Sequence, residues 1–294
     1  GAVTPMTLAK DQIIKIIRDA GKIPVERDVY YTPINIYTDN VIGKIPYLNS
    51  VPFYSHFEKR QFRILPIAPR RMGELSSKEL IDAGLFSLMS YFEQETNLEL
   101  MNYCIATRDQ VKSVMLFSKE GWNGLEGKTI GITDDTATSV RLLQVLLKKK
   151  YGVKSTFERM HSGVNDCSNF DAVLLIGDEA LRRNKYGLPG FELVFDLAWE
   201  WYEWQKLPFV FAVWALKKSS PVEKKTELRQ LLQFSLEKSE AALETIGALH
   251  GMRIGLTPNE TKEYLEGFSY RLGEREREAM EVFRKLFDEV AVSV

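Results

Sequence analysis

The sequence predicts an α/β protein with two lobes, and three observations lead to this fold class. From Val41 onward, short apolar runs of strand length alternate with segments of helical periodicity. The chain has 294 residues, which is enough for two hydrophobic cores. A complete strand–helix unit, residues 119–208, lies between two apolar strands, 114–118 and 209–214, which we expect to be the crossings between the lobes.

The predicted elements follow from apolar periodicity. Strands are expected at 41–46, 64–68, 114–118, 129–133, 172–176, 193–195 and 209–214. Helices are expected at 7–20, 74–82, 138–150, 178–185, 222–249 and 274–289. The helix at 138–150 has the clearest pattern, because four apolar residues recur at helical spacing and Gly152 follows as a stop signal.

These elements give the expected domain boundaries. Residues 1–37 form an N-terminal extension, 38–118 the first part of lobe 1, 119–208 lobe 2, and 209–294 the second part of lobe 1 with the C-terminal helices. A chain that crosses twice between lobes forms a hinge and a central cleft, which is a common way to enclose a small ligand.

Composition excludes several classes of function. Lys and Arg number 39 and Asp and Glu 40, so this nearly neutral chain lacks the basic character of a nucleic-acid-binding protein. Two isolated cysteines and three scattered histidines have no metal-ligand spacing, and the cysteines suit a reducing compartment. The longest apolar run, 209–216, is too short to span a bilayer. No signal-peptide pattern is seen near the N-terminus. We therefore expect a cytoplasmic protein without a metal or a membrane contact.

A candidate anion site lies where the strand at 129–133 leads into the helix at 138–150. The first N–H groups of a helix have no acceptor within it, so we expect those of Thr138, Ser139 and Val140, together with hydroxyl groups, to suit a carboxylate, since no glycine-rich phosphate loop is present. The alternative is that Thr136 or Thr138 only caps the helix.

Polar residues also end the first strand of lobe 1. Asn49 and Ser50 each offer donor and acceptor groups at the carboxyl end of a strand, where α/β proteins usually bind ligands. The alternative is an Asx-type turn.

Further candidates are Ser87, Ser113, Gly177 and Asp178, each next to a predicted strand or another short apolar run. In the functional interpretation the Asp178 carboxylate holds a ligand hydroxyl, and in the structural one it caps the helix at 178–185. No Gly-x-Ser-x-Gly elbow surrounds either serine, so a nucleophilic hydrolase is not indicated.

Taken together, these segments resemble the chorismate dehydratase family of the futalosine route to menaquinone. The similarity covers about residues 41–290, and its motifs occur in the same order. They are Ile45-Pro46-Tyr47-Leu48-Asn49-Ser50-Val51-Pro52, Asp82-Ala83-Gly84-Leu85-Phe86-Ser87-Leu88, Val111-Lys112-Ser113-Val114, Thr138-Ser139-Val140-Arg141-Leu142, Leu174-Leu175-Ile176-Gly177-Asp178-Glu179-Ala180-Leu181, Trp201-Tyr202-Glu203-Trp204 and Leu207-Pro208-Phe209-Val210-Phe211-Ala212-Val213-Trp214. The sequence departs from the family pattern at Leu85, at Arg108-Asp109-Gln110 and at Ala137.

The resemblance implies the fold of type II periplasmic binding proteins, used as a cytoplasmic enzyme. It implies loss of water from chorismate, a small dicarboxylate, to give 3-[(1-carboxyvinyl)oxy]benzoate without a cofactor. Asn49 and Ser113 are then the expected catalytic residues. The residues expected to bind the substrate are Ser50, Ser87, Thr138, Ser139, Val140, Gly177 and Asp178.

Residues 10–33 instead resemble the tail of a radical-SAM enzyme of the same pathway, which suggests a fusion or association with such an enzyme. Two alternatives to the dehydratase remain. One is a non-catalytic solute-binding protein for a small carboxylate. The other is the related dihydroxynaphthoate synthase, which has a His-Glu pair where this chain has Gly177-Asp178.

Overall fold

The computed structural model of the protein describes residues 40–54, 62–134, 136–161 and 163–292, and these residues form two compact units. Unit 1 contains the described residues up to Pro46 and those of Ser50–Tyr103 and Ala212–Ala241. Unit 2 contains Tyr47–Asn49 and the described residues of Cys104–Phe211 and Ala242–Val294. The expected extension 1–37 and helix 7–20 lie outside the described residues.

The chain passes from unit 1 to unit 2 within strand β4 (Leu98–Thr107) and returns within strand β10 (Phe209–Lys217). Residues 104–118 and 242–292 therefore belong to the same compact unit as the described part of 119–208. The lobe boundaries expected at 118/119 and 208/209 stay a prediction, as do the hinge and the cleft.

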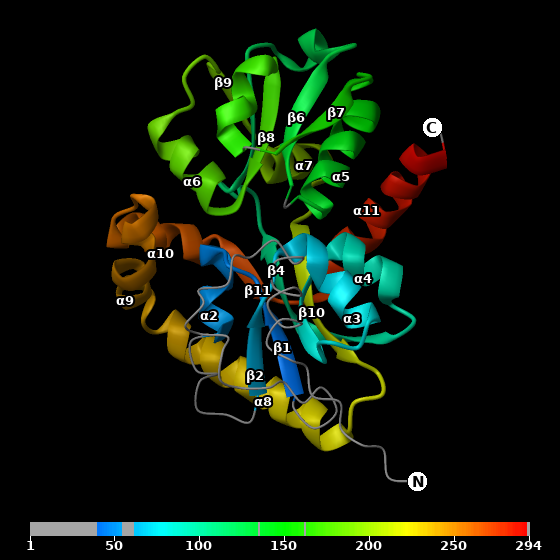
Figure 1. Ribbon diagram of the computed structural model, residues 1–294, viewed down its shortest axis with the longest axis vertical. Helices are drawn as coiled ribbons and strands as arrows, with labels where there is room; N and C mark the ends of the chain where they lie inside the picture. Colours follow the sequence, from blue (N-terminus) through cyan, green and yellow to red (C-terminus); the bar gives the residue numbers. More distant parts are fainter. Residues whose placement is uncertain (1–39, 55–61, 135, 162, 293–294) are drawn as a thin grey trace. The chain divides into compact units, whose positions relative to one another are not determined.

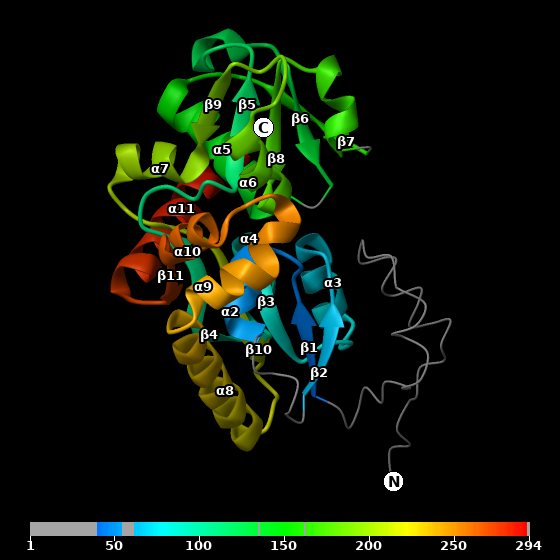
Figure 2. The ribbon, with the colours of Figure 1, turned by 90° about the vertical axis from the view of Figure 1, so that its left-hand side faces the viewer.

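Unit 1 is built on three parallel strands. Its elements are β1 (Asn40–Lys44), α2 (Val51–Tyr54), β2 (Phe62–Pro66), α3 (Met72–Ser77), β3 (Ala83–Ser87), α4 (Leu88–Gln94), α8 (Val222–Glu240) and parts of β4 and β10. Strand β1 pairs with both β2 and β3, so the connections β1→β2 and β2→β3 cross the sheet in opposite directions. Right-handed crossovers then place α2 and α3 on opposite faces, as Figures 1 and 2 show.

Unit 2 has a five-stranded sheet in the order β7-β6-β8-β5-β9. Its elements are β5 (Val114–Ser118), β6 (Thr129–Thr133), α5 (Thr138–Val145), β7 (Thr156–Met160), β8 (Ala172–Ile176), α6 (Gly177–Tyr186), β9 (Leu193–Asp196), α7 (Leu197–Gln205), α9 (Leu243–Ile246), α10 (Pro258–Glu266), β11 (Phe268–Arg271) and α11 (Glu274–Val292). The other sheet, which includes the unit 1 strands β1, β2 and β3, has the order β11-β4-β10-β3-β1-β2.

The best-marked sequence predictions are confirmed. Strands β5, β6 and β8 have the predicted bounds. Helix α5 continues as a π-helical segment, Leu146–Tyr151, and Gly152 ends it in the left-handed conformation with φ 66°. The structure adds elements that were absent from the prediction, namely β3, β4, β7, β11, α2, α4, α7 and α10.

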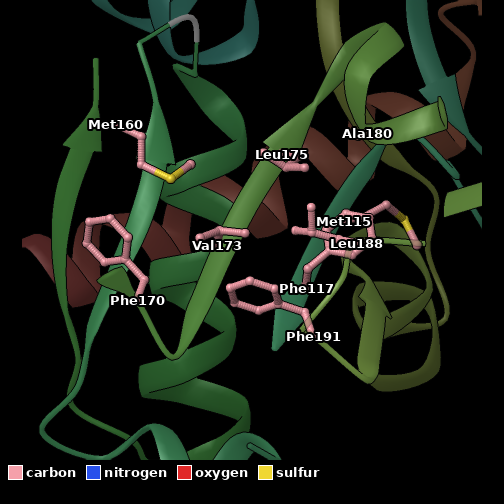
Figure 3. Packing of buried hydrophobic residues seen from close by; sticks show 9 residues of the cluster. All are labelled: Met115, Phe117, Met160, Phe170, Val173, Leu175, Ala180, Leu188 and Phe191. Atoms are coloured by element: carbon pink, nitrogen blue, oxygen red, sulfur yellow. The ribbon is translucent and has the colours of Figure 1, made fainter. Parts of the chain in front are cut away.

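The core of unit 2 follows from strand periodicity. In β5, Met115 and Phe117 face the same side, and the antiparallel register sets them opposite Leu175 and Val173 of β8. Figure 3 shows these four side chains with the rest of their buried cluster. The other members are Met160, Phe170, Ala180, Leu188 and Phe191.

Among the described residues, no helix is both long enough and apolar enough to cross a bilayer.

The first prediction concerns this core. Phe117 is fully buried, so Phe117→Ala should lower the free energy of unfolding by about 3–5 kcal/mol through lost burial and a residual cavity. Leu249→Ala is the control in the same unit. Leu249 is 67% exposed, so its truncation should change stability by less than about 0.5 kcal/mol. Guanidinium unfolding followed by circular dichroism measures both, and equal midpoints for Phe117→Ala and wild type would contradict the packing.

Candidate functional site

One edge of the unit 2 sheet gathers most of the predicted site residues. Strand β8 runs parallel to β6 and antiparallel to β5, and Val114 pairs with Ile176. The residues after β6 and β8 and those before β5 therefore meet at the same edge, where the Gly177 N–H donates to the Ser113 carbonyl at 2.8 Å. Strand β9 also ends there, because Met115 pairs with Asp196. We call this edge the site edge.

The dipeptide Gly177-Asp178 holds the segment Tyr47–Asn49 against the site edge. Asp178 Oδ1 accepts a hydrogen bond of 3.0 Å from the backbone N–H of Leu48. Gly177 has φ 66°, and a Cβ there would lie 2.6 Å from Cε1 of Tyr47. Only glycine permits both this conformation and the close approach of the ring.

Asp178 does not cap helix α6. The N-cap position is Ile176, and no side chain there accepts from the first turn. The Asp178 carboxylate instead binds the Leu48 amide, so its expected role as a ligand for a substrate hydroxyl stays a prediction.

Asn49 is anchored by its backbone rather than by its side chain. The Tyr270 hydroxyl donates to the Asn49 carbonyl at 2.8 Å. Asn49 Oδ1 is buried and has no hydrogen-bond partner among the described residues, so an Asx turn is not formed with them. Leaving a buried acceptor without a partner costs about 1–3 kcal/mol, and such groups often mark a functional site.

Ser113 is held from two sides. Its Oγ lies 2.7 Å from Oη of Tyr264 on α10 and 3.4 Å from the Val111 carbonyl. Burial raises the pKa of Tyr264 well above its ordinary value, and the nearby Asp178 carboxylate adds to this rise. Tyr264 therefore stays protonated and can donate to Ser113 Oγ, while the Ser113 hydroxyl donates the long 3.4 Å bond to the Val111 carbonyl, which a closer acceptor could replace.

The start of helix α5 is partly capped. The Val140 N–H donates to Thr136 Oγ1 at 3.2 Å, while Ala137 occupies the N-cap position without a side-chain bond. Thr136 thus fulfils the capping alternative for one amide, and that amide already has a protein partner. Thr138 and Ser139 are buried. Anion binding at this helix start stays a prediction.

Ser50 and Ser87 belong to unit 1, and each hydroxyl binds a residue close to it in the sequence. Ser50 Oγ donates to the Ile45 carbonyl at 3.1 Å. Ser87 is the N-cap of α4 and accepts from the Ser90 N–H at 3.2 Å. Each hydroxyl stabilises its own turn, and a substrate contact at either serine stays a prediction.

Four residues of the site edge were not singled out from the sequence. Tyr264 and Tyr270 reach Ser113 and Asn49 from 151 and 221 residues away, and no local pattern predicts such a pairing. Tyr47 lay within a recognised motif without an assigned role. Asp196 ends a strand, and a polar residue at a strand end is the signal that marked Asn49. The same signal could have identified Asp196.

Solved structures with a similar fold include a protein of Archaeoglobus fulgidus, with a TM-score of 0.69 at 16% identity over 86% of this chain and 97% of that chain. The aliphatic sulphonate-binding protein SsuA of Escherichia coli gives 0.59 at 16% identity, over 86% and 88%. A Candida albicans protein with the generic periplasmic binding protein fold gives 0.59 at 11%, over 86% and 90%. This chain therefore has the two-lobed α/β fold of these proteins.

Sequence comparison is more specific. A curated chorismate dehydratase of Thermus thermophilus is 31% identical over 257 residues, which is 83% of this chain and 93% of that protein. The model of the menaquinone biosynthesis family matches residues 41–289. The chain belongs to the menaquinone biosynthesis family.

Proposed function

We propose that this protein is a chorismate dehydratase, a carbon–oxygen lyase that removes water from chorismate to give 3-[(1-carboxyvinyl)oxy]benzoate. The family match and the 31% identity to a protein of that name support this activity. The resemblance to solute-binding proteins lies below 25% identity and concerns the fold alone.

The observation that carries the proposal is the connection between Asn49 and Ser113. The dipeptide Gly177-Asp178 binds Leu48 through the Asp178 carboxylate and binds Ser113 through the Gly177 amide. Ser113 and Leu48, the residue before Asn49, are thus bonded to the same dipeptide. Asn49 Oδ1, for which the described part of the chain offers no hydrogen-bond partner, gives this arrangement an acceptor for a donor group of the substrate.

The reaction suits such a site. Dehydration of chorismate breaks one ring C–H bond and one ring C–O bond, and the ring becomes aromatic, so the elimination has a large driving force. A proton acceptor must take the ring proton, and the hydroxyl must leave as water. We infer that a carboxylate of the substrate accepts the proton, while Asn49 and Ser113 hold the ring in the reactive geometry.

The second carboxylate of the substrate has a candidate site at the start of α5. Thr138 and Ser139 stand in its first turn, where backbone N–H groups and the helix dipole favour an anion. Val140 can contribute only if the substrate displaces Thr136 from its amide. A cofactor-free reaction, a cytoplasmic location and an association with a radical-SAM enzyme remain parts of this proposal.

The direct test is to incubate the purified protein with chorismate and to follow the products by mass spectrometry. A dehydratase forms the benzoate, which is lighter than chorismate by one water. A solute-binding protein binds chorismate and returns it unchanged, and a dihydroxynaphthoate synthase leaves it unchanged. Either result would overturn the proposal.

The second prediction concerns Asn49. Asn49→Ala should lower kcat/KM about ten- to a hundredfold, because one hydrogen bond made in the transition state is lost. Asn49→Asp keeps the shape but sets a negative charge against a dianionic substrate, so KM should rise and the effect should weaken at high salt. Asn123→Ala removes an exposed asparagine of the same unit and serves as the control. If Asn49→Ala keeps both the wild-type rate and the wild-type melting temperature, Asn49 has only a structural role.

The third prediction concerns Gly177. Gly177→Ala adds a Cβ at a left-handed position and against the Tyr47 ring, so both stability and turnover should fall. Gly127→Ala is a matched control. Gly127 has φ 72° in the same unit, and a Cβ there meets nothing within 4 Å. In both variants the strained backbone should lower the free energy of unfolding by about 1–2 kcal/mol, but only Gly177→Ala should also lower kcat/KM. Equal turnover in the two variants would contradict the role of the Tyr47 contact.

A further inference from the structure

The Asp196 carboxylate connects two segments at the site edge. Oδ2 accepts from the Lys112 N–H at 2.8 Å and from the Val111 N–H at 3.0 Å. Oδ1 accepts from the Ala198 N–H at 3.0 Å, from the Trp199 N–H at 3.1 Å and, in a longer contact, from the Val111 N–H at 3.2 Å. The single carboxylate thus binds the first turn of α7 through Oδ1 and the backbone before Ser113 mainly through Oδ2.

Helix capping alone does not require this carboxylate. A serine, threonine or asparagine caps a helix about as well as an aspartate does. Burial raises the pKa of Asp196 above its ordinary value despite its four amide donors, so keeping a charge here has a cost that a neutral cap avoids. The feature that only a carboxylate provides is a second oxygen facing the 111–112 backbone.

That backbone has an uncommon conformation. Lys112 has φ 65°, in the left-handed region that residues with a Cβ rarely adopt. It immediately precedes Ser113, so its conformation sets the direction in which the Ser113 side chain leaves the chain. On the other side Ser113 is held by Gly177, through its carbonyl, and by Tyr264, through its hydroxyl. Asp196 completes the set of contacts around Ser113.

We propose that Asp196 is a positioning residue, which fixes the Ser113 hydroxyl for catalysis by holding the amides of Val111 and Lys112. This inference rests on the proposed dehydratase activity, in which Ser113 touches the substrate. Asp196 itself acts only through the backbone of residues 111–113.

Two substitutions separate positioning from capping. In Asp196→Asn, the amide oxygen can cap α7 only if the NH₂ group takes the place of Oδ2. The Lys112 bond and the 3.0 Å Val111 bond are then lost, Val111 keeps at most its 3.2 Å contact with the capping oxygen, and the cap remains. Asp196→Ser keeps a good cap with a side chain too short to reach the loop. Ser118→Ala is the control, because Ser118 is a buried serine at the opposite end of β5 whose Oγ accepts from the Glu120 N–H at 3.1 Å.

The experiment has two readouts on the full chain. Hydrogen exchange by NMR at Val111 and Lys112 should be faster in both Asp196 variants than in wild type or Ser118→Ala. With chorismate as substrate, Asp196→Asn and Asp196→Ser should lower kcat/KM about ten- to a hundredfold. In a Ser113→Ala background the same changes should lower it by less than about threefold, because the residue through which Asp196 acts is already gone.

If the Asp196 and Ser113 substitutions lower kcat/KM by independent factors, the proposal is overturned, because a residue that only stabilises the fold acts independently of Ser113. Amide hydrogen exchange at the wild-type rate at Val111 and Lys112 in both Asp196 variants would also overturn it. A wild-type protein that leaves chorismate unchanged refutes the proposed function instead. In that case the exchange measurement still decides whether Asp196 holds the loop.

Discussion

The hydrogen bond between Asp178 and the Leu48 amide is the contact on which the candidate site depends. It joins residues 130 positions apart, and it attaches the Tyr47–Asn49 segment to the end of β8. Gly177 completes the attachment, because its missing side chain lets the Tyr47 ring approach and its amide binds Ser113. Together with the bond from the Tyr270 hydroxyl to the Asn49 carbonyl, these two residues fix the Asn49 backbone beside Ser113.

The fold could be predicted where local pattern and tertiary structure agree. Strands β5, β6 and β8 are short apolar runs in a sheet with helices on its faces, so their whole length is marked in the sequence. Strand β4 was missed because its burial is irregular along Leu98–Thr107, with exposed Asn102 in the middle, and this follows neither strict alternation nor a continuous apolar run. The chain passes between the units in this strand, so the compact units begin elsewhere than the expected lobes.

The site could be predicted as far as strand ends identify it. Asn49, Ser113 and Gly177 were recognised by their positions beside strands and by family motifs. Their partners could not be recognised, because Tyr264 and Tyr270 lie on later elements whose packing is set by the tertiary fold. Asp178 shows the same limit, because its sequence position predicts either a helix cap or a ligand contact, whereas its carboxylate binds a distant backbone amide.

We propose that the site edge of unit 2 holds the substrate through Asn49, Ser113 and the start of α5. A crystal structure of the protein with the benzoate product bound would locate the ligand relative to these residues. We expect the Asn49 amide within about 2.7–3.2 Å of a polar atom of the product, and one product carboxylate at the same distance from the backbone amide of Thr138 or Ser139. A product that binds with both carboxylates more than about 5 Å from this helix start, and with no contact to Asn49, would show that the site edge does not hold the substrate.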